Sequence, residues 1–446
     1  MTQESPQRPP SSPTSAVASL LRRAWFPPVA VFAIAMVVRL VIIALFPDPW
    51  QFDAYQRWAA RDHLWVQVWL PATQVVVWLV AQLGGGILTL RLTMAVIASL
   101  TVAMGALLAR RLGGERAAWI YLPMAFYGPY LMWSVVPYQE STLLLVLFGG
   151  LLVDKRWPVV GALMIGALAF CRYEGWPLLL VYVVVQRRWS ASLCFWGVAL
   201  YFGIDALGLN DPYAASPDSF EDWEGLEDKL RERFVRRMFV GLWYEMTNSG
   251  LVWMLFPALL CLFRFPWKRA QWMLVFALLG QAAATLGWMF SLGVVFSRMT
   301  VIPGMILAVI AASELSFRWD RFSVWSKRAL VPFTICLLCW TVYTSVSHVQ
   351  RMFRVMRYDV ELVRTVESCP DDAWAIVPRR HPGPRRRHDG CEVLQGLSDL
   401  RAGQEFVCEP WDWGGPEPTL RAVWTSKEKA YIVERVGGQA SADCPF

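Results

Sequence analysis

Two acidic residues stand just beyond the ends of apolar segments, where a carboxylate can meet water and lipid at once. Asp53 lies in "PDPWQFDAYQRWAARDHLW", residues 47–65, and Glu140 lies in "SVVPYQESTLLL", directly before Ser141. A carboxylate in such a place can accept the proton of an attacking hydroxyl, which is worth about 10²–10⁴-fold in rate. The structural alternatives are a solvated loop acid or helix cap for Asp53, and a helix-start glutamate favoured by the dipole for Glu140.

Arg172 and Glu174 share the connection "CRYEGW" between two short apolar strings, "PVVGALMIGALAF" and "PLLLVYVVV". Ionisable groups at membrane depth are costly, and they usually mark a functional cavity. Short helices with irregular backbone at that depth also indicate a site, because protein or water must satisfy the backbone. A guanidinium there suits bidentate binding of a phosphate. The alternative is a mutual ion pair that holds the turn.

Three further residues are candidates for binding a substrate. Arg298, in "FSRMTVIPG", begins a late apolar segment, where it would contribute to an anion-binding funnel or snorkel to the membrane interface. Tyr55 and Tyr138 lie two residues from the candidate acids and are candidate substrate ligands. For Arg39, inside the first apolar segment, we expect an inward structural role.

The composition is that of a helical membrane protein. Of the 446 residues, 56% are hydrophobic and only 17% are charged, and the mean hydropathy is +0.37. Apolar runs of about 15–22 residues recur from Phe26 to Val346, and about 20 such residues span a bilayer as a helix. Residues 1–25 lack an apolar core with a cleavage site, which predicts a disordered cytoplasmic tail rather than a signal peptide.

Basic clusters separate the apolar segments and should face the cytoplasm. They predict eleven crossings within a transmembrane domain of residues 26–349, with the N-terminus inside and the C-terminus outside. The expected crossings are 27–46, 88–109, 117–134, 141–153, 158–171, 175–186, 191–208, 250–263, 271–290, 299–315 and 329–346. If residues 66–83 also crossed the membrane, every later basic cluster would lie on the outer face. They are therefore interpreted as an interfacial or re-entrant helix. The outer-face loops would be 47–87 and 209–248, and the acidic stretch 211–228 would be a lid.

Residues 350–446 are polar, with short apolar strings typical of strands: "AWAIVP", "EFVCE", "LRAVWTS" and "KAYIVER". We expect a small α+β domain on the outer face, so the fold class is an all-α polytopic membrane protein with a C-terminal α+β domain. Four cysteines lie in this part: Cys369, Cys391, Cys408 and Cys444. Their even number favours one or two disulfides of undetermined pairing over a zinc site. The basic loop 379–388 is solvated or touches anionic headgroups.

Several motifs then follow one another in a recognisable order. "FDAYQRWA" comes first, then a proline-bearing amphipathic segment, "LTLRLTMAVIASLTVAMGALLARRLGGERAAWIYLPMAFYGPYLMWSVVPYQES", "GALMIGALAFCRYEGWPLLL" and "SRMTVIPGMILA". Over residues 27–346 this order resembles the GT-C superfamily of membrane glycosyltransferases. That group includes the protein O-mannosyltransferases, the aminoarabinose transferase of lipid A and the GPI mannosyltransferases. The first loop has no Asp-Glu or Asp-x-Asp pair, since Asp48 and Asp53 are five residues apart.

The resemblance implies inverting transfer of a monosaccharide, with mannose the first guess, from a polyprenyl-phosphate carrier to a hydroxyl of a protein, lipid or glycan. It implies that Asp53 is the catalytic base, that Glu140 assists at the acceptor site, and that basic residues hold the phosphate. Of the candidates above, Arg172, Glu174, Arg298, Tyr55 and Tyr138 would bind the donor. No metal and no other cofactor is inferred. We expect a multi-pass protein of a bacterial inner membrane, with the C-terminal domain in the periplasm.

Two alternative functions stay open at this point. A lipid-linked sugar flippase or other transporter is the second hypothesis, although no internal repeat typical of transporters is visible. A membrane scaffold that presents residues 350–446 is the third, and it leaves the "CRYEGW" pair unexplained. The absence of a Walker loop, a GxGxxG, an HExxH and a Ser-His-Asp constellation argues against ATP-driven transport and zinc hydrolysis. Nucleic acid is not expected as a partner.

Overall fold

The structure is a computed structural model, and it falls into two units that are described separately. The first unit comprises Met1–Ile43 and Asp62–Val346, and the second comprises Ala44–Arg61 and Ser347–Phe446. The structure describes residues 26–46, 54, 57–58, 61–64, 70–206, 246–247, 251–264, 267–292, 297–325, single residues from 328 to 350, 373–376, 419–422 and 431–434.

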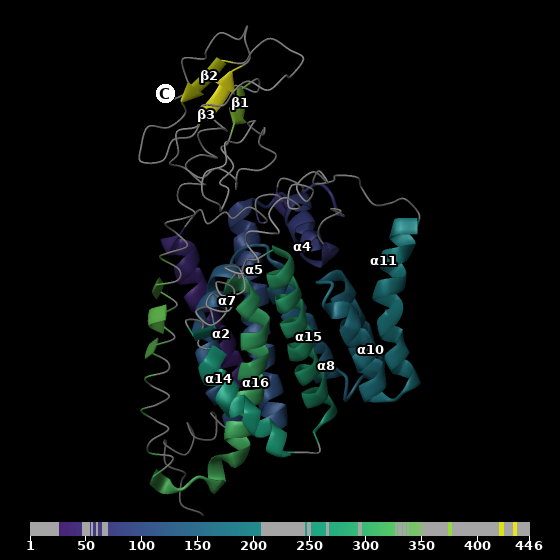
Figure 1. Ribbon diagram of the computed structural model, residues 1–446, viewed down its shortest axis with the longest axis vertical. Coiled ribbons are helices and arrows are strands. Elements are labelled where there is room, and N and C mark those ends of the chain that lie inside the picture. The colour runs from purple at the N-terminus through teal and green to yellow at the C-terminus, as the bar shows by residue number, and fades with distance from the viewer. Residues whose placement is uncertain are drawn as a thin grey trace, which may run out of the picture. The chain divides into compact units, whose positions relative to one another are not determined.

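The described part of the first unit is helical (Figure 1). Its elements are α2 (Phe26–Leu45, which runs two residues into the second unit), α4 (Pro71–Gln82), α5 (Ile87–Gly113), α6 (Glu115–Ile120), η1 (Leu122–Phe126), α7 (Gly128–Trp133), α8 (Gln139–Val153), α9 (Pro158–Gly166), η2 (Ala167–Phe170), α10 (Gly175–Gln186), η3 (Trp189–Phe195), α11 (Trp196–Ala206), α14 (Leu251–Leu259), η5 (Leu260–Arg264), α15 (Arg269–Leu292), η6 (Ser297–Thr300), α16 (Val301–Arg318) and η7 (Trp319–Arg321).

Four of the described helices are long and apolar enough to cross a membrane: Phe26–Leu45, Ile87–Gly113, Arg269–Gly287 and Arg298–Arg321. Shorter apolar helices cover 139–153, 158–170, 175–186 and 189–204. This is the pattern of an integral membrane protein, because the four helices have 19 to 27 residues and a bilayer core requires about 20. The total of eleven crossings and their direction stay predictions.

One expected crossing, residues 117–134, is wrong as a continuous helix. The chain there forms α6, η1 and α7 in succession. Proline occupies the first turn of both η1 and α7, at Pro123 and Pro129. Since proline lacks an N–H and its ring clashes with the preceding turn, it starts helices readily and interrupts them. The segment is apolar, as the sequence indicates, but its helix is interrupted twice.

The segment expected to be interfacial or re-entrant contains α4, whose 12 residues are too short to cross a bilayer. Helix α4 contacts α5, α8 and η2. The centre of the unit is α5, which packs against α8 and α16, while α16 also contacts α14 and α15. Figure 1 shows α5, α8, α15 and α16 running alongside one another. Helix α8 is therefore anchored from several sides, and both of its ends carry charged residues.

The described residues after 350 form one antiparallel sheet of β1 (Ala373–Ile376), β2 (Thr419–Ala422) and β3 (Tyr431–Glu434), in the order β1-β3-β2. The strands overlap three of the four strings that the sequence analysis singled out. "EFVCE", the four cysteines, the acidic stretch 211–228 and the loop 379–388 lie outside the described residues. The α+β class of this domain stays a prediction.

Candidate functional site

A buried network of ion pairs joins Glu140, Arg172 and Glu174. The Nη1 atom of Arg172 donates a hydrogen bond to Glu140 Oε1 at 2.7 Å. The Nη2 and Nε atoms of Arg172 donate to Glu174 Oε1 at 2.7 Å and to Glu174 Oε2 at 3.1 Å. The pairing with Glu174 is thus bidentate, which fixes the plane of the guanidinium group. Residues 32 positions apart in the chain meet in one cluster.

The local sequence explains why these side chains meet. Tyr138 is in an extended conformation before α8, so Glu140 falls in the first turn of that helix. Arg172 and Glu174 lie in the turn between η2 and α10. Gly175 begins α10, and a Cβ atom there would lie 2.5 Å from the backbone oxygen of Leu168. The turn is therefore compact because Gly175 allows the two backbone segments to approach closely.

This network is largely buried. Glu140 is 1% exposed, and the side chains of Arg172 and Glu174 are 15% and 16% exposed. Burial alone would raise the pKa of the Glu174 carboxyl, but the hydrogen bonds and charge of Arg172 outweigh it and lower that pKa. Burial likewise acts to lower the pKa of Arg172, and the charges of Glu140 and Glu174 raise it overall. Arg172 and Glu174 are therefore held in their charged forms.

One atom of the cluster has no hydrogen-bond partner. Among the described residues, no donor reaches Glu140 Oε2, although this oxygen is buried. A buried carboxylate oxygen without a partner carries a desolvation cost of about 1–3 kcal/mol or more. A hydroxyl group of a bound substrate that donated to this oxygen would remove that cost.

Tyr138 and Arg298 lie at the same site. The guanidinium carbon of Arg298 is 5.4 Å from the centre of the Tyr138 ring, and Trp133 packs edge-on against the same ring at 4.9 Å. The charge of Arg298 acts on both Arg172 and Glu174. The structure therefore brings together five residues that the sequence analysis singled out: Glu140, Tyr138, Arg172, Glu174 and Arg298.

No protein-family model and no curated protein matches the chain. In structure it is similar to the oligosaccharyltransferase of Archaeoglobus fulgidus, solved with zinc and sulfate, at 18% identity and a TM-score of 0.47. That match covers 76% of this chain and 56% of the archaeal one. It is also similar to ArnT of Cupriavidus metallidurans in the apo state, at 16% identity and a TM-score of 0.41, covering 79% and 73% of the two chains. These are likenesses of fold alone, so the function proposed below depends on the residues of this chain.

The sequence analysis missed two features beside the ion pairs. Thr73 and Gln74, both fully buried in α4, form a polar pair in an otherwise apolar helix. Thr73 Oγ1 is 3.4 Å from Thr142 Oγ1 in the first turns of α8, so α4 lies against the helix that carries Glu140. The adjacent polar residues "TQ" in "PATQVVVWLVAQ" were the available signal.

The second missed feature is an aromatic cluster that begins one residue before Glu174. Tyr173 contacts Trp176 at 5.8 Å, and Trp176 contacts Tyr201 and Phe202 of α11 at 5.3 and 5.7 Å. Tyr173 is half exposed. An exposed aromatic surface next to buried charges can pack against the apolar face of a bound molecule. Its signal was the sequence "YFG" in α11, whose partner in the turn could not be recognised from spacing.

The remaining predicted residues lie apart from this cluster or outside the description. Arg39 is buried in α2, where its Nη1 donates to Ala35 O at 3.0 Å and its guanidinium carbon is 5.0 Å from the centre of the Tyr130 ring. This is the inward position that the sequence analysis expected. Asp53 and Tyr55 lie outside the described residues. Among the described residues, no group of three or more His, Cys, Asp and Glu side chains is arranged to hold a metal ion.

Proposed function

We propose that this protein is a membrane glycosyltransferase of the GT-C type. It would transfer a monosaccharide from a polyprenyl-phosphate carrier to a hydroxyl acceptor on the outer face of the membrane. The observation that carries this proposal is the buried Glu140 carboxylate, which Arg172 holds by one oxygen while the other oxygen has no described hydrogen-bond partner. The order of the sequence motifs around it supports the same class of reaction.

The reaction requires one base, one anion-binding group and protection from water. The oxygen of the acceptor hydroxyl attacks the anomeric carbon, and the bond from that carbon to the phosphate oxygen breaks. The proton of the hydroxyl passes to a carboxylate, and the polyprenyl phosphate leaves with the bonding electrons. We assign the proton to Asp53 and the orientation of the acceptor hydroxyl to Glu140. Proton transfer to a positioned carboxylate contributes about 10²–10⁴-fold to the rate.

The two arginines take different parts in this proposal. Arg172 donates three hydrogen bonds to carboxylates, so its part is to hold Glu140 in a fixed orientation. Arg298, beside the Tyr138 ring, supplies a positive charge for the phosphate of the donor. Glu174 fixes Arg172, and Tyr55 adds a polar contact to the donor. The half-exposed Tyr173 offers an aromatic face to the sugar ring.

The finer assignments follow from the resemblance of the motifs. We propose mannose as the sugar, a protein, lipid or glycan hydroxyl as the acceptor, and no metal cofactor. The membrane would be a bacterial inner membrane, with Glu140 and residues 350–446 on the periplasmic side. The eleven crossings of the sequence analysis give this orientation, because the basic clusters then face the cytoplasm.

The test uses the full chain in lipid vesicles with radiolabelled polyprenyl-phosphate monosaccharides, each offered with an acceptor extract. Release of sugar from the carrier is followed for the wild type, Asp53→Asn and Glu140→Gln. Asp62→Asn is the matched control for Asp53→Asn, because Asp62 is an exposed acid nine residues later in the chain. Glu174→Gln is the control for Glu140→Gln, because it also weakens the ion-pair network but leaves the Glu140 carboxylate in place.

A transferase with these roles loses about 10²-fold or more of its turnover in Asp53→Asn while it still binds the donor, and Asp62→Asn retains activity. Glu140→Gln should lose more activity than Glu174→Gln if its carboxylate contacts the acceptor. Equal turnover in wild type and Asp53→Asn would exclude Asp53 as the base. Movement of labelled donor across the vesicle membrane without release of sugar would contradict a transferase and favour a flippase.

A further inference from the structure

A second charged site lies at the opposite ends of the two helices that flank the ion-pair network. It is a cavity of about 490 Å³ between the ends of α5, α8 and α10 and the start of α15. Five cationic residues and one acidic residue are among its described lining: Arg111, Lys155, Arg188, Lys268, Arg269 and Asp154. The volume is within the range of about 300–1,000 Å³ that is typical of ligand sites. The excess of positive charge requires an explanation.

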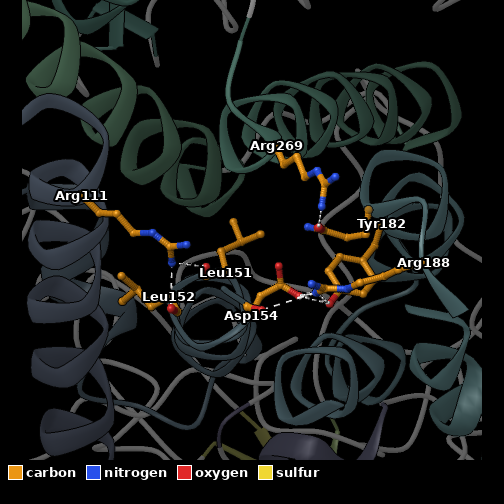
Figure 2. A network of polar contacts seen from close by, with 8 residues as sticks. Arg111, Leu151, Leu152, Asp154, Tyr182, Arg188 and Arg269 are labelled. Atoms are coloured by element: carbon orange, nitrogen blue, oxygen red, sulfur yellow. Dashed lines mark hydrogen bonds and ion pairs between the residues drawn. The ribbon is translucent and has the colours of Figure 1, made fainter. Parts of the chain in front are cut away.

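The contacts inside the cavity neutralise only part of this positive charge. Arg188 forms an ion pair with Asp154, and the hydroxyl of Tyr182 donates to the same carboxylate. Arg111 Nη1 donates to the backbone oxygens of Leu151 and Leu152 at 2.8 and 2.7 Å. Figure 2 shows Arg188 in contact with Asp154, with Arg111 of α5 and Arg269 of α15 on other sides of the same region. Among the described residues lining the cavity, Asp154 is the one acid that can neutralise a cation.

The structural explanation for cations at this place is that they balance helix dipoles. The C-termini of α5, α8 and α10 each carry roughly half a negative charge, and the N-terminus of α15 carries roughly half a positive charge. Together with Asp154 these sum to about −2 against five cations, which leaves about +3. Capping contacts are made by Arg111, whose donors reach the end of α8, and by Lys268, whose Nζ donates to Leu112 O near the end of α5 at 3.2 Å. The half charges of the helix ends are already counted in this sum, so capping does not remove the remaining excess. An anion with more than one negative charge would balance it.

One buried polar atom of this cavity is suited to bind a ligand. The Nε atom of Arg188 is buried, and no described residue accepts a hydrogen bond from it. Among the described residues, Arg269 Nη1 donates to the amide oxygen of Gln186 at 3.4 Å. The guanidinium groups of Arg188 and Arg269 can therefore still bind negatively charged oxygens. Phosphate oxygens suit the paired N–H donors of a guanidinium group.

Two tryptophans indicate where this anion comes from. Trp157, which follows the end of α8, is 57% exposed, and Trp189, which follows Arg188, is 94% exposed. Exposed tryptophan next to basic residues at helix ends is typical of the boundary between hydrocarbon and headgroups. The guanidinium carbon of Arg156 lies 5.3 Å from the centre of the Trp157 ring, at the same boundary. These residues favour a position of the cavity at the level of lipid phosphates rather than in bulk water.

We propose that this cavity binds the phosphate of an anionic lipid headgroup, on the face of the first unit opposite to Glu140. Basic cavities between transmembrane helices are suited to this kind of ligand. The site is separate from the proposed transfer reaction, because α8 and α10 place about 18–22 Å between the two charged regions, at 1.5 Å per residue. The phosphate would join the ends of α5, α8, α10 and α15.

The test measures how strongly the full chain selects a spin-labelled phosphatidic acid over the same label on phosphatidylcholine, in phosphatidylcholine vesicles. The variant is Lys155→Gln with Arg269→Gln, two exposed cations that form no ion pair with Asp154. Arg156→Gln with Arg321→Gln is the matched control, since it removes two exposed cations outside the described lining. A parallel measurement adds inorganic pyrophosphate to the same vesicles.

We expect the wild type and the control to select phosphatidic acid, and the cavity variant to lose about 25-fold of this selectivity. Each of the two cations removed near a membrane surface contributes roughly fivefold in affinity for anionic lipid, which is the basis of that figure. Equal selectivity in the cavity variant and the wild type, or none in either, would overturn the proposal. Tight binding of pyrophosphate without selection of phosphatidic acid would also overturn it, because the ligand would then be a soluble phosphate.

Discussion

The two ends of α8 differ in their balance of charge. At Glu140, two carboxylates share one arginine, and the ion pairs are closed and largely buried. At Asp154, one carboxylate faces several cations around an open cavity. Helix α10 repeats the contrast, because Glu174 precedes its start and Arg188 follows its end. The same two helices thus hold one region whose charged side chains pair with one another, with only Glu140 Oε2 left without a described partner, and one region with an excess of cations.

The contrast indicates what each region can do. A closed network of buried ion pairs fixes side chains in one orientation, which a reaction with a positioned carboxylate requires. An open region with unbalanced positive charge is suited to attract a ligand, because the ligand completes the neutralisation. The predictions below test whether the first region depends on its internal pairs and the second on what it binds.

The largest effect is expected when the central arginine of each region is replaced. Arg172→Met leaves Glu140 and Glu174 buried without their cation, and breaking a buried pair in this way costs about 3–5 kcal/mol. Arg188→Met should cost less, because Asp154 keeps the hydrogen bond from Tyr182 and other cations remain nearby. Unfolding of the full chain in detergent, followed by tryptophan fluorescence, gives both values. Equal losses of stability would remove the distinction between a closed and an open region.

The sequence indicated the first region only in part. It predicted that Arg172 and Glu174 mark a site, because two ionisable residues interrupt an apolar stretch. It gave no means to recognise that Glu140 completes the pairing, since the contact spans 32 positions and depends on how α8 packs beside η2. The structural alternative for Arg172 and Glu174, a mutual ion pair, is present and extends to a third residue.

Similar limits apply to the fold. The apolar runs predicted the helices, because burial in lipid requires about 20 apolar residues whatever the tertiary packing. They could not predict that Pro123 and Pro129 divide one run into three pieces, since proline is tolerated in many membrane helices. The basic residues of the second region were used only to orient the helices. Nothing in their spacing predicted that Arg111, Lys155 and Arg269 line one cavity.

A second prediction changes the backbone and leaves every charge in place. Gly175→Ala places a Cβ atom 2.5 Å from Leu168 O and would displace the turn that carries Arg172 and Glu174. Gly161→Ala places one 2.6 Å from the Cα atom of Asp154 at the other end. Each should cost about 1–3 kcal/mol of stability through overpacking. Sugar transfer should fall only in Gly175→Ala, and a comparable fall in Gly161→Ala would contradict the separation of the two regions.

A third prediction concerns acid. The pKa of Glu174 is lowered in the folded protein from its ordinary value of 4.5, since Arg172 stabilises the carboxylate. A lowered pKa contributes stability that is fully present above about pH 4.5 and is lost as the pH falls through the folded value. Unfolding midpoints of the wild type should therefore fall more steeply below about pH 4.5 than those of Glu174→Gln. Parallel pH profiles for the two proteins would show that this pairing does not contribute.

The smallest effect on stability is expected in the region around Asp154. Lys155→Gln with Arg269→Gln removes exposed charge from the open region, so stability without anionic lipid should change by no more than about 0.5 kcal/mol. Phosphatidic acid should stabilise the wild type, because a ligand that binds only the folded state shifts unfolding by mass action. The same lipid should stabilise the double variant much less, and salt should weaken the effect in the wild type. An open region of this kind contributes little to stability by itself and contributes through its ligand, whereas the closed region loses stability as soon as one member of the network is removed.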